Sequence, residues 1–223
     1  MHGKIKEKIT NIIPEYAIFP LILALTVNNC IYIGVAQFRN MLSFSSLATT
    51  LDERIPLITP FVIFYVLAYV QWVLNYVLIG RNSKELCYRF VSGDILSKII
   101  CLFFFVFFPT TLVRPEITGT DIFSRLVQFI YTVDSPVNLF PSIHCLESWC
   151  CIRAAFQLHL KTAKRTRMYQ VATIIMSLGV FTSTLFIKQH VIVDVFGGIA
   201  AFEVGMAITK ALSCHRQGRG SLR

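Results

Sequence analysis

The sequence has few charged residues, which make up 15% of its 223 positions, and only 12 of them are acidic. Hydrophobic residues account for 55%. A soluble domain of this length needs a much larger polar surface, so the composition favours a membrane protein. The formal net charge of +9 does not indicate nucleic-acid binding, because the sequence has no basic patch with interleaved aromatic residues and no nucleic-acid-binding motif.

The sequence also lacks cysteines at the spacing of a metal site or of a disulfide framework, and it has no internal repeats and no low-complexity linkers. Its seven cysteines lie in or beside apolar segments or near the predicted cytoplasmic side, and the adjacent pair Cys150 and Cys151 cannot chelate as a C-x-x-C pair does. We therefore expect the cysteines to be small packing residues. We expect no metal and no cofactor, and a single domain over residues 1–223.

Apolar residues gather into six stretches, each close to the roughly 20 residues that a helix needs to cross a bilayer. The stretches lie at 14–38, 56–80, 95–113, 142–160, 169–187 and 190–213. The predicted fold class is therefore all-α, a polytopic membrane bundle of six transmembrane helices. The first stretch is long, contains Asn28 and Asn29 and lacks a small-residue cleavage site, so we expect a retained helix rather than a signal peptide.

Lysine and arginine are unevenly divided between the two sides of such a bundle. One side, formed by the N-terminus, the 81–94 and 161–168 loops and the tail from 210, carries 14 of them, and the other side carries 5. Because cytoplasmic loops are enriched in these residues, both termini are predicted to be cytoplasmic. The protein is then a multi-pass component of the cell membrane.

The longest outside connection, 114–141, contains a short amphipathic pattern. Apolar and polar residues alternate at helical spacing after Asp121, a suitable N-cap, and the pattern ends at Asp134. We expect a helix lying at the membrane interface. It either covers the end of the bundle or acts as a lid that guides lipid headgroups to a site.

Ionisable residues mark the outer edge of three of the predicted spans. Arg114 follows the third, His144 opens the fourth, and His190 and Asp194 open the sixth. Such residues are costly at a membrane edge and are therefore functional candidates. Each also has a purely structural interpretation: an anchoring arginine, an ordinary Pro-Ser helix start and a satisfied His-Asp pair. Their convergence on one face favours a common site.

The residue types at this face suit phosphoryl transfer. Four residues are about one helical turn, so Asp194 can orient the His190 ring and leave its other nitrogen free as a nucleophile. Ser142 starts a helix whose free amides attract anions, and His144 in its first turn can protonate a leaving alkoxide. Arg114 can grip phosphate oxygens with two parallel hydrogen bonds.

In order and spacing, these residues resemble the three motifs of the type 2 phosphatidic acid phosphatase superfamily, a group of membrane lipid phosphatases and phosphotransferases. The family patterns are K-x6-R-P, P-S-G-H and S-R-x5-H-x3-D. The matching residues are Arg114-Pro115, Pro141-Ser142-Ile143-His144, and Ser183-Thr184 with His190 and Asp194. The positions that depart from the patterns are Phe107, Ile143 and Thr184, in place of lysine, glycine and arginine.

The resemblance implies that His190 forms a phosphohistidine, with Asp194 orienting it and His144 as the acid for the leaving group. No metal is required, because cationic side chains stabilise the transition state. The residues predicted to bind phosphate are Arg114, Ser142, Lys188 and Ser183. Lys188 is assigned as a substitute for the missing motif cations, and its alternative role is that of a lysine anchoring the membrane edge.

The expected function is that of an integral-membrane hydrolase that removes phosphate from a lipid phosphate or diphosphate at the extracytoplasmic face. Its partners are then the lipid substrate and the bilayer. Two alternatives remain. One is a lipid phosphotransferase similar to inositol phosphorylceramide synthase, which shares the covalent step but uses an alcohol acceptor. The other is a non-catalytic membrane relative, which the missing motif cations favour.

Overall fold

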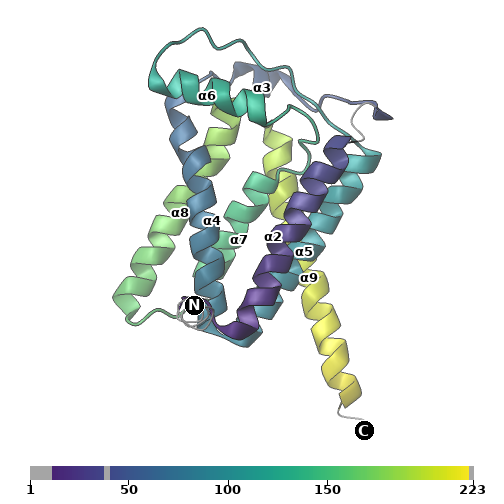
Figure 1. Ribbon diagram of the computed structural model, residues 1–223, viewed down its shortest axis with the longest axis vertical. Coiled ribbons are helices and arrows are strands. Elements are labelled where there is room, and N and C mark those ends of the chain that lie inside the picture. Colours follow the sequence, from purple (N-terminus) through teal and green to yellow (C-terminus); the bar gives the residue numbers. More distant parts are fainter. Residues whose placement is uncertain (1–11, 38–40, 221–223) are drawn as a thin grey trace, which may run out of the picture.

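The computed structural model describes residues 12–37 and 41–220, whose regular structure is helical. The elements in order are α2 (Glu15–Gln37), α3 (Thr50–Arg54), η2 (Thr59–Phe61), α4 (Val62–Asn82), α5 (Lys84–Phe107), α6 (Ile122–Val133), α7 (Ile143–Ala155), α8 (Ala163–Phe186) and α9 (Ile192–Gly220). Figure 1 shows the longer helices running side by side, with α3 and α6 across one end. The start of α2 and the end of α9 lie at the opposite end (Figure 1).

Five helices of the described residues are long and apolar enough to cross a membrane: α2, η2 with α4, α5, α8 and α9. The all-helical, membrane-type fold is therefore confirmed, whereas the sixth predicted span, 142–160, contains only the 13-residue helix α7. Nine of those residues are buried, because α7 packs against α4, α5, α8 and α9. Several of the charges that predicted the orientation, including Lys4, Lys6 and Lys8, lie outside the described residues.

A single residue, Ser83, separates α4 from α5, so the predicted 81–94 loop is wrong. Ser83 has extended backbone angles, and its hydroxyl accepts a hydrogen bond from the Leu86 amide, which caps the new helix. The segment that follows continues as α5 because its apolar residues, among them Leu86, Phe90 and Val91, are buried in the bundle. The helix ends at Phe107, before the predicted limit of 113, since Pro109 disfavours helical angles at the residue before it.

The predicted amphipathic helix is present as α6 (Ile122–Val133). The Asp121 side chain accepts hydrogen bonds from the amides of Phe123 and Ser124, and the helix gives way to extended backbone at Asp134. Val127 is buried against η2 and α4. Helix α6 therefore covers one end of the bundle.

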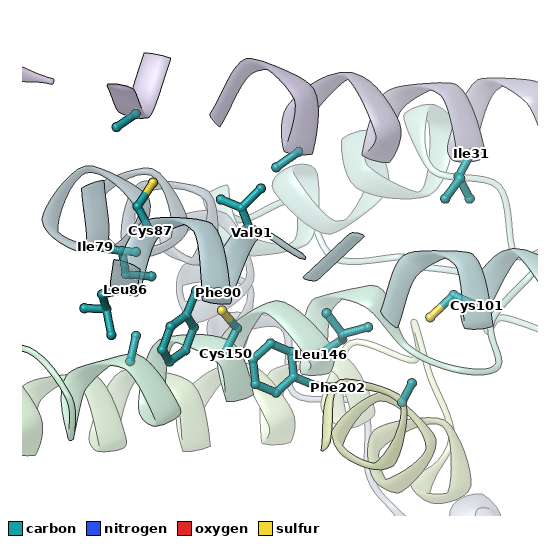
Figure 2. Close-up of a cluster of buried hydrophobic side chains, with 14 of the residues drawn as sticks. Ile31, Ile79, Leu86, Cys87, Phe90, Val91, Cys101, Leu146, Cys150 and Phe202 are labelled. Atoms are coloured by element: carbon teal, nitrogen blue, oxygen red, sulfur yellow. The ribbon is translucent and has the colours of Figure 1, made fainter. Parts of the chain in front are cut away.

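The main apolar core lies between α2, α5, α7 and α9. Figure 2 shows Phe90 and Phe202 facing each other in its centre, next to Leu146 and Cys150. Their ring centroids are 6.4 Å apart. The buried cysteines are free thiols that fill small gaps, as the sequence predicted.

A buried ion cluster joins α5 to α7 inside this core. The Lys98 ammonium lies 2.9 Å from Asp94 and 2.6 Å from Glu147, and the Tyr76 hydroxyl donates to the second oxygen of Glu147. Lys98 is 2% exposed and Asp94 is fully buried. A buried ion pair adds little net stability, but removing one partner leaves an uncompensated charge.

We expect Lys98→Met to destabilise the protein by about 3–5 kcal/mol, because two buried carboxyl groups then lose their shared cation. The measurement is the thermal unfolding midpoint of the detergent-purified protein, with Lys164→Met, an exposed lysine of α8, as the matched control. An equal midpoint for both variants would contradict the role of the cluster.

Candidate active site

His190 and Asp194 meet at the start of α9. The Nδ1 atom of His190 lies 3.2 Å from Oδ2 of Asp194, and the two residues are 8% and 0% exposed. The sequence predicted a stacked pair on one helical turn, but His190 precedes the helix, which begins at Ile192. Asp194 also accepts a hydrogen bond from the Val191 amide. The carboxylate thus fixes Nδ1 and leaves Nε2 of His190 as the ring nitrogen available to a ligand.

The loop before α9 is shaped by Lys188, whose φ of 53° turns the chain sharply. The amides of Gln189 and His190 then both donate to the carbonyl of Thr184 at the end of α8. This shared acceptor ties the histidine to a rigid helix end. The His190 backbone is therefore held by α8, and its imidazole is held by Asp194 of α9.

His144 lies in the first turn of α7, opposite His190. The two ring centroids are 5.9 Å apart. The His144 ring stacks on Tyr65 with centroids 4.4 Å apart, and its Nε2 lies 3.4 Å from the Tyr69 hydroxyl. Trp72, one turn further along α4, has its ring 5.4 Å away. This aromatic face of α4 was not predicted, although the spacing of four and three residues could have indicated it.

A backbone hydrogen bond joins the two histidine segments directly. The Ser142 amide donates to the Asp194 carbonyl at 3.0 Å. The close approach depends on Gly198, because a Cβ atom there would lie 2.3 Å from the Ser142 carbonyl oxygen. The start of α7 and the start of α9 therefore form one unit, with His144 and His190 on it.

Ser142 and Ser183 are fully buried. The Ser142 hydroxyl accepts a hydrogen bond from the Cys145 amide as the N-cap of α7. The Ser183 hydroxyl donates to the carbonyl of Phe61, 2.7 Å away, and so joins α8 to η2. The hydroxyls of Ser142 and Ser183, both predicted to bind phosphate, are thus used in hydrogen bonds that hold the helices around the site.

Arg114 lies in the loop between α5 and α6, and its guanidinium is held by three neighbours. It donates to the carbonyl of Asp134 and to the side-chain oxygen of Gln189, and it lies 4.7 Å from the centre of the Tyr131 ring. Gln189 directly precedes His190. The arginine is thereby positioned close to His190, with which it shares a cavity.

Lys188 contacts the segment around α3. Its ammonium donates to the carbonyls of Asp52 and Ile55 at 2.9 and 2.6 Å. The Asp52 carboxylate accepts a hydrogen bond from the Ile192 amide at 2.7 Å and so caps the start of α9. The segment around α3 is thus held against the site by the contacts of Lys188 and by the Asp52 cap, neither of which was predicted from the sequence.

Asp52 is held in its charged form. Burial acts to raise the pKa of its carboxyl group, but the Thr49 hydroxyl and the amides of Ile192 and Thr49 outweigh that effect, and the pKa is lowered below its ordinary value. The cap is therefore present above the pKa of the unfolded chain and is lost as the pH falls through the folded pKa.

Two cavities meet at His190. The first, of about 300 Å³, is lined by Arg114 and Lys188 and is called the Arg114 cavity here. The second, of about 330 Å³, is lined by His144 and Asn28 and is called the His144 cavity. His190 lines both. Within the described residues, no group of three histidine, cysteine, aspartate or glutamate side chains is arranged to hold a metal ion.

This geometry brings His190, Asp194, His144, Arg114 and Lys188 together. A substrate phosphorus next to His190 would face the cationic side chains through the Arg114 cavity. The leaving oxygen of that substrate would face His144 through the His144 cavity. The arrangement can therefore support nucleophilic attack by one histidine and proton donation by the other.

We expect Asp52→Ala to lower stability at neutral pH by about 0.5–2 kcal/mol, as for loss of a helix cap. The difference from the wild-type protein should shrink as the pH falls through the lowered carboxyl pKa. Thermal unfolding between about pH 3 and 7 tests this expectation. The exposed neighbour Glu53→Ala serves as the control. A pH-independent difference would contradict the role of the carboxylate charge.

The sequence matches no protein-family model. No curated protein and no solved structure matches it either. The chemistry assigned to these residues therefore depends on their arrangement in this structure and on the motif pattern in the sequence.

Proposed function

We propose that the protein is an integral-membrane lipid phosphatase that works through a phosphohistidine, as its resemblance to the type 2 phosphatidic acid phosphatase superfamily implies. Its substrate is a lipid phosphate or diphosphate. The observation that carries the proposal is the placement of His190, oriented by Asp194, 5.9 Å from the ring of His144. The two histidines are contributed by segments far apart in the sequence.

The first step forms the covalent intermediate. The Nε2 lone pair of His190 attacks phosphorus, and the bond from phosphorus to the leaving oxygen breaks with its electron pair on that oxygen. His144 must be protonated for this step, and it then donates that proton to the leaving oxygen. Asp194 stabilises the positive charge that develops on His190 through its contact with Nδ1.

The second step releases the phosphate. Water loses a proton to the now neutral His144 and attacks phosphorus, and the phosphorus–nitrogen bond breaks with its electron pair returning to His190. Arg114 neutralises the charge of the equatorial oxygens in both steps, because it lines the cavity next to His190. The same intermediate yields a phosphotransferase when an alcohol replaces water.

We further propose six spans, with α7 as the short central one and both termini in the cytoplasm. The excess of lysine and arginine on one side supports this orientation. In Figure 1, α3 and α6 then lie at the extracytoplasmic end. The histidines and Arg114 belong to the same end, so the substrate lies in the outer leaflet.

We expect inorganic phosphate release from at least one lipid among an isoprenoid diphosphate, phosphatidate and phosphatidylglycerophosphate. The detergent-purified protein should retain this activity with a chelator present, because its own cations supply the charge stabilisation. His190→Ala should abolish release, and Asp194→Asn should lower kcat by about 10²–10⁴-fold. Release is measured with a colorimetric phosphate assay.

His159→Ala is the matched control, because His159 is an exposed histidine beyond the far end of α7. It should leave the rate unchanged. Phosphate recovered on an added alcohol rather than free would identify a phosphotransferase. Neither product, with any lipid or alcohol, would refute the enzyme proposal in favour of a non-catalytic membrane protein.

Lys188 provides a separate test of how the missing motif cations are replaced. Both of its hydrogen-bond acceptors are neutral carbonyls, and it lines the Arg114 cavity. We expect Lys188→Gln to lower kcat/KM by about 10²-fold, the effect of losing one charged contact to the transition state. The glutamine amide can still donate to a carbonyl, so thermal stability should change little. Full activity in this variant would restrict Lys188 to a structural role.

A further inference from the structure

The His144 cavity contains polar groups that the proposed chemistry does not use. It is lined by Asn28 of α2, by Asn138 in the loop before α7 and by Gln189. The side-chain oxygens of Asn28 and Asn138 and the side-chain nitrogen of Gln189 are buried and have no hydrogen-bond partner in the described residues. Buried amide groups are costly when unpaired, so three around one cavity indicate a polar ligand.

The orientation of the Gln189 amide is fixed by its neighbour. Its oxygen accepts a hydrogen bond from Arg114, so the side that is left unpaired is the N–H donor. The cavity therefore requires an acceptor at Gln189 and donors at the two asparagines. A hydroxyl group supplies both, whereas an ammonium group has no acceptor and a phosphate ion has no donor when fully ionised.

The position of Asn28 strengthens this interpretation. It lies within the apolar helix α2, where a polar side chain is costly. The lining of the His144 cavity also includes the apolar side chains of Ile31 and Val35 from α2 and Phe105 from α5. A ligand there would place its polar part at the amides and the histidines and its apolar part along α2 and α5.

We propose that the His144 cavity binds the alcohol portion of the substrate and that this alcohol carries a further hydroxyl group, as a glycerol unit does. The inference rests on the proposed function, because it assigns the substrate class of the same site. The leaving oxygen lies next to His144, and the additional hydroxyl donates to the side-chain oxygen of Asn28 and accepts from the side-chain nitrogen of Gln189. Lipids whose leaving group has no hydroxyl, such as isoprenoid diphosphates, leave these amides unpaired.

The test compares two substrates that differ by a single hydroxyl group. One is phosphatidylglycerophosphate, and the other is its analogue with a propanediol unit that lacks the free hydroxyl. We expect kcat/KM to be about 10-fold higher for the first lipid, corresponding to about 1.4 kcal/mol for a hydrogen-bonded hydroxyl. Asn28→Leu should remove this preference, so that kcat/KM becomes similar for the two lipids.

Asn82→Leu is the matched control, because Asn82 ends α4 at the far side of the bundle and donates to the carbonyl of His159. It should keep the 10-fold preference. Equal rates for the two lipids in the wild-type protein, with His190-dependent release, would overturn this inference and leave the phosphatase standing.

A binding measurement separates the two proposals when no turnover is seen. Both lipids are titrated into His190→Ala protein in detergent micelles by isothermal titration calorimetry. Tighter binding of the hydroxyl-bearing lipid, lost in the double variant with Asn28→Leu, supports the cavity assignment without any chemistry. Equal binding of the two lipids would overturn it, because water alone would then satisfy the amides.

Discussion

The hydrogen bond from the Ser142 amide to the Asp194 carbonyl is the constraint on which the site depends. It joins the starts of α7 and α9, and it gives a partner to the Ser142 amide, which has none within its own helix. Gly198 permits the contact, and Asp52 completes it by capping Ile192 from the segment around α3. The reactive groups are therefore positioned by the way in which the bundle satisfies its helix ends.

The same requirement explains the rest of the polar interior. In an apolar bundle each buried polar group needs a partner, and the partners come from different helices: Lys98 from α5 with Glu147 from α7, and Ser183 from α8 with the carbonyl of Phe61. These links fix the relative positions of the helices. The amides around the His144 cavity differ from these links, because three of their atoms have no partner in the described residues and belong to side chains that line the same cavity.

Much of the fold could be predicted from apolar stretches alone, but helix α7 could not. A hydropathy pattern does not distinguish a membrane span from a short helix enclosed by other helices. The contact between His190 and Asp194 could be predicted from their spacing. The partners of Lys188 could not, because Asp52 lies 136 residues away in the sequence and acts through its backbone carbonyl. In the sequence, Asn28 indicated only that the first apolar stretch is a retained helix, and its place beside the His144 cavity could not be predicted.

The shortness of α7 has a consequence for the supply of water. A helix of 13 residues spans about 20 Å, roughly 10 Å less than the hydrocarbon core of a bilayer. If its far end lies near one membrane surface, His144 lies in a recess well below the other. In the proposed mechanism, a lipid would reach that depth from the side, and water would enter through the Arg114 cavity, which His190 lines. In the proposed mechanism, the wetting of that passage would determine whether the phosphohistidine is hydrolysed or persists until an alcohol arrives.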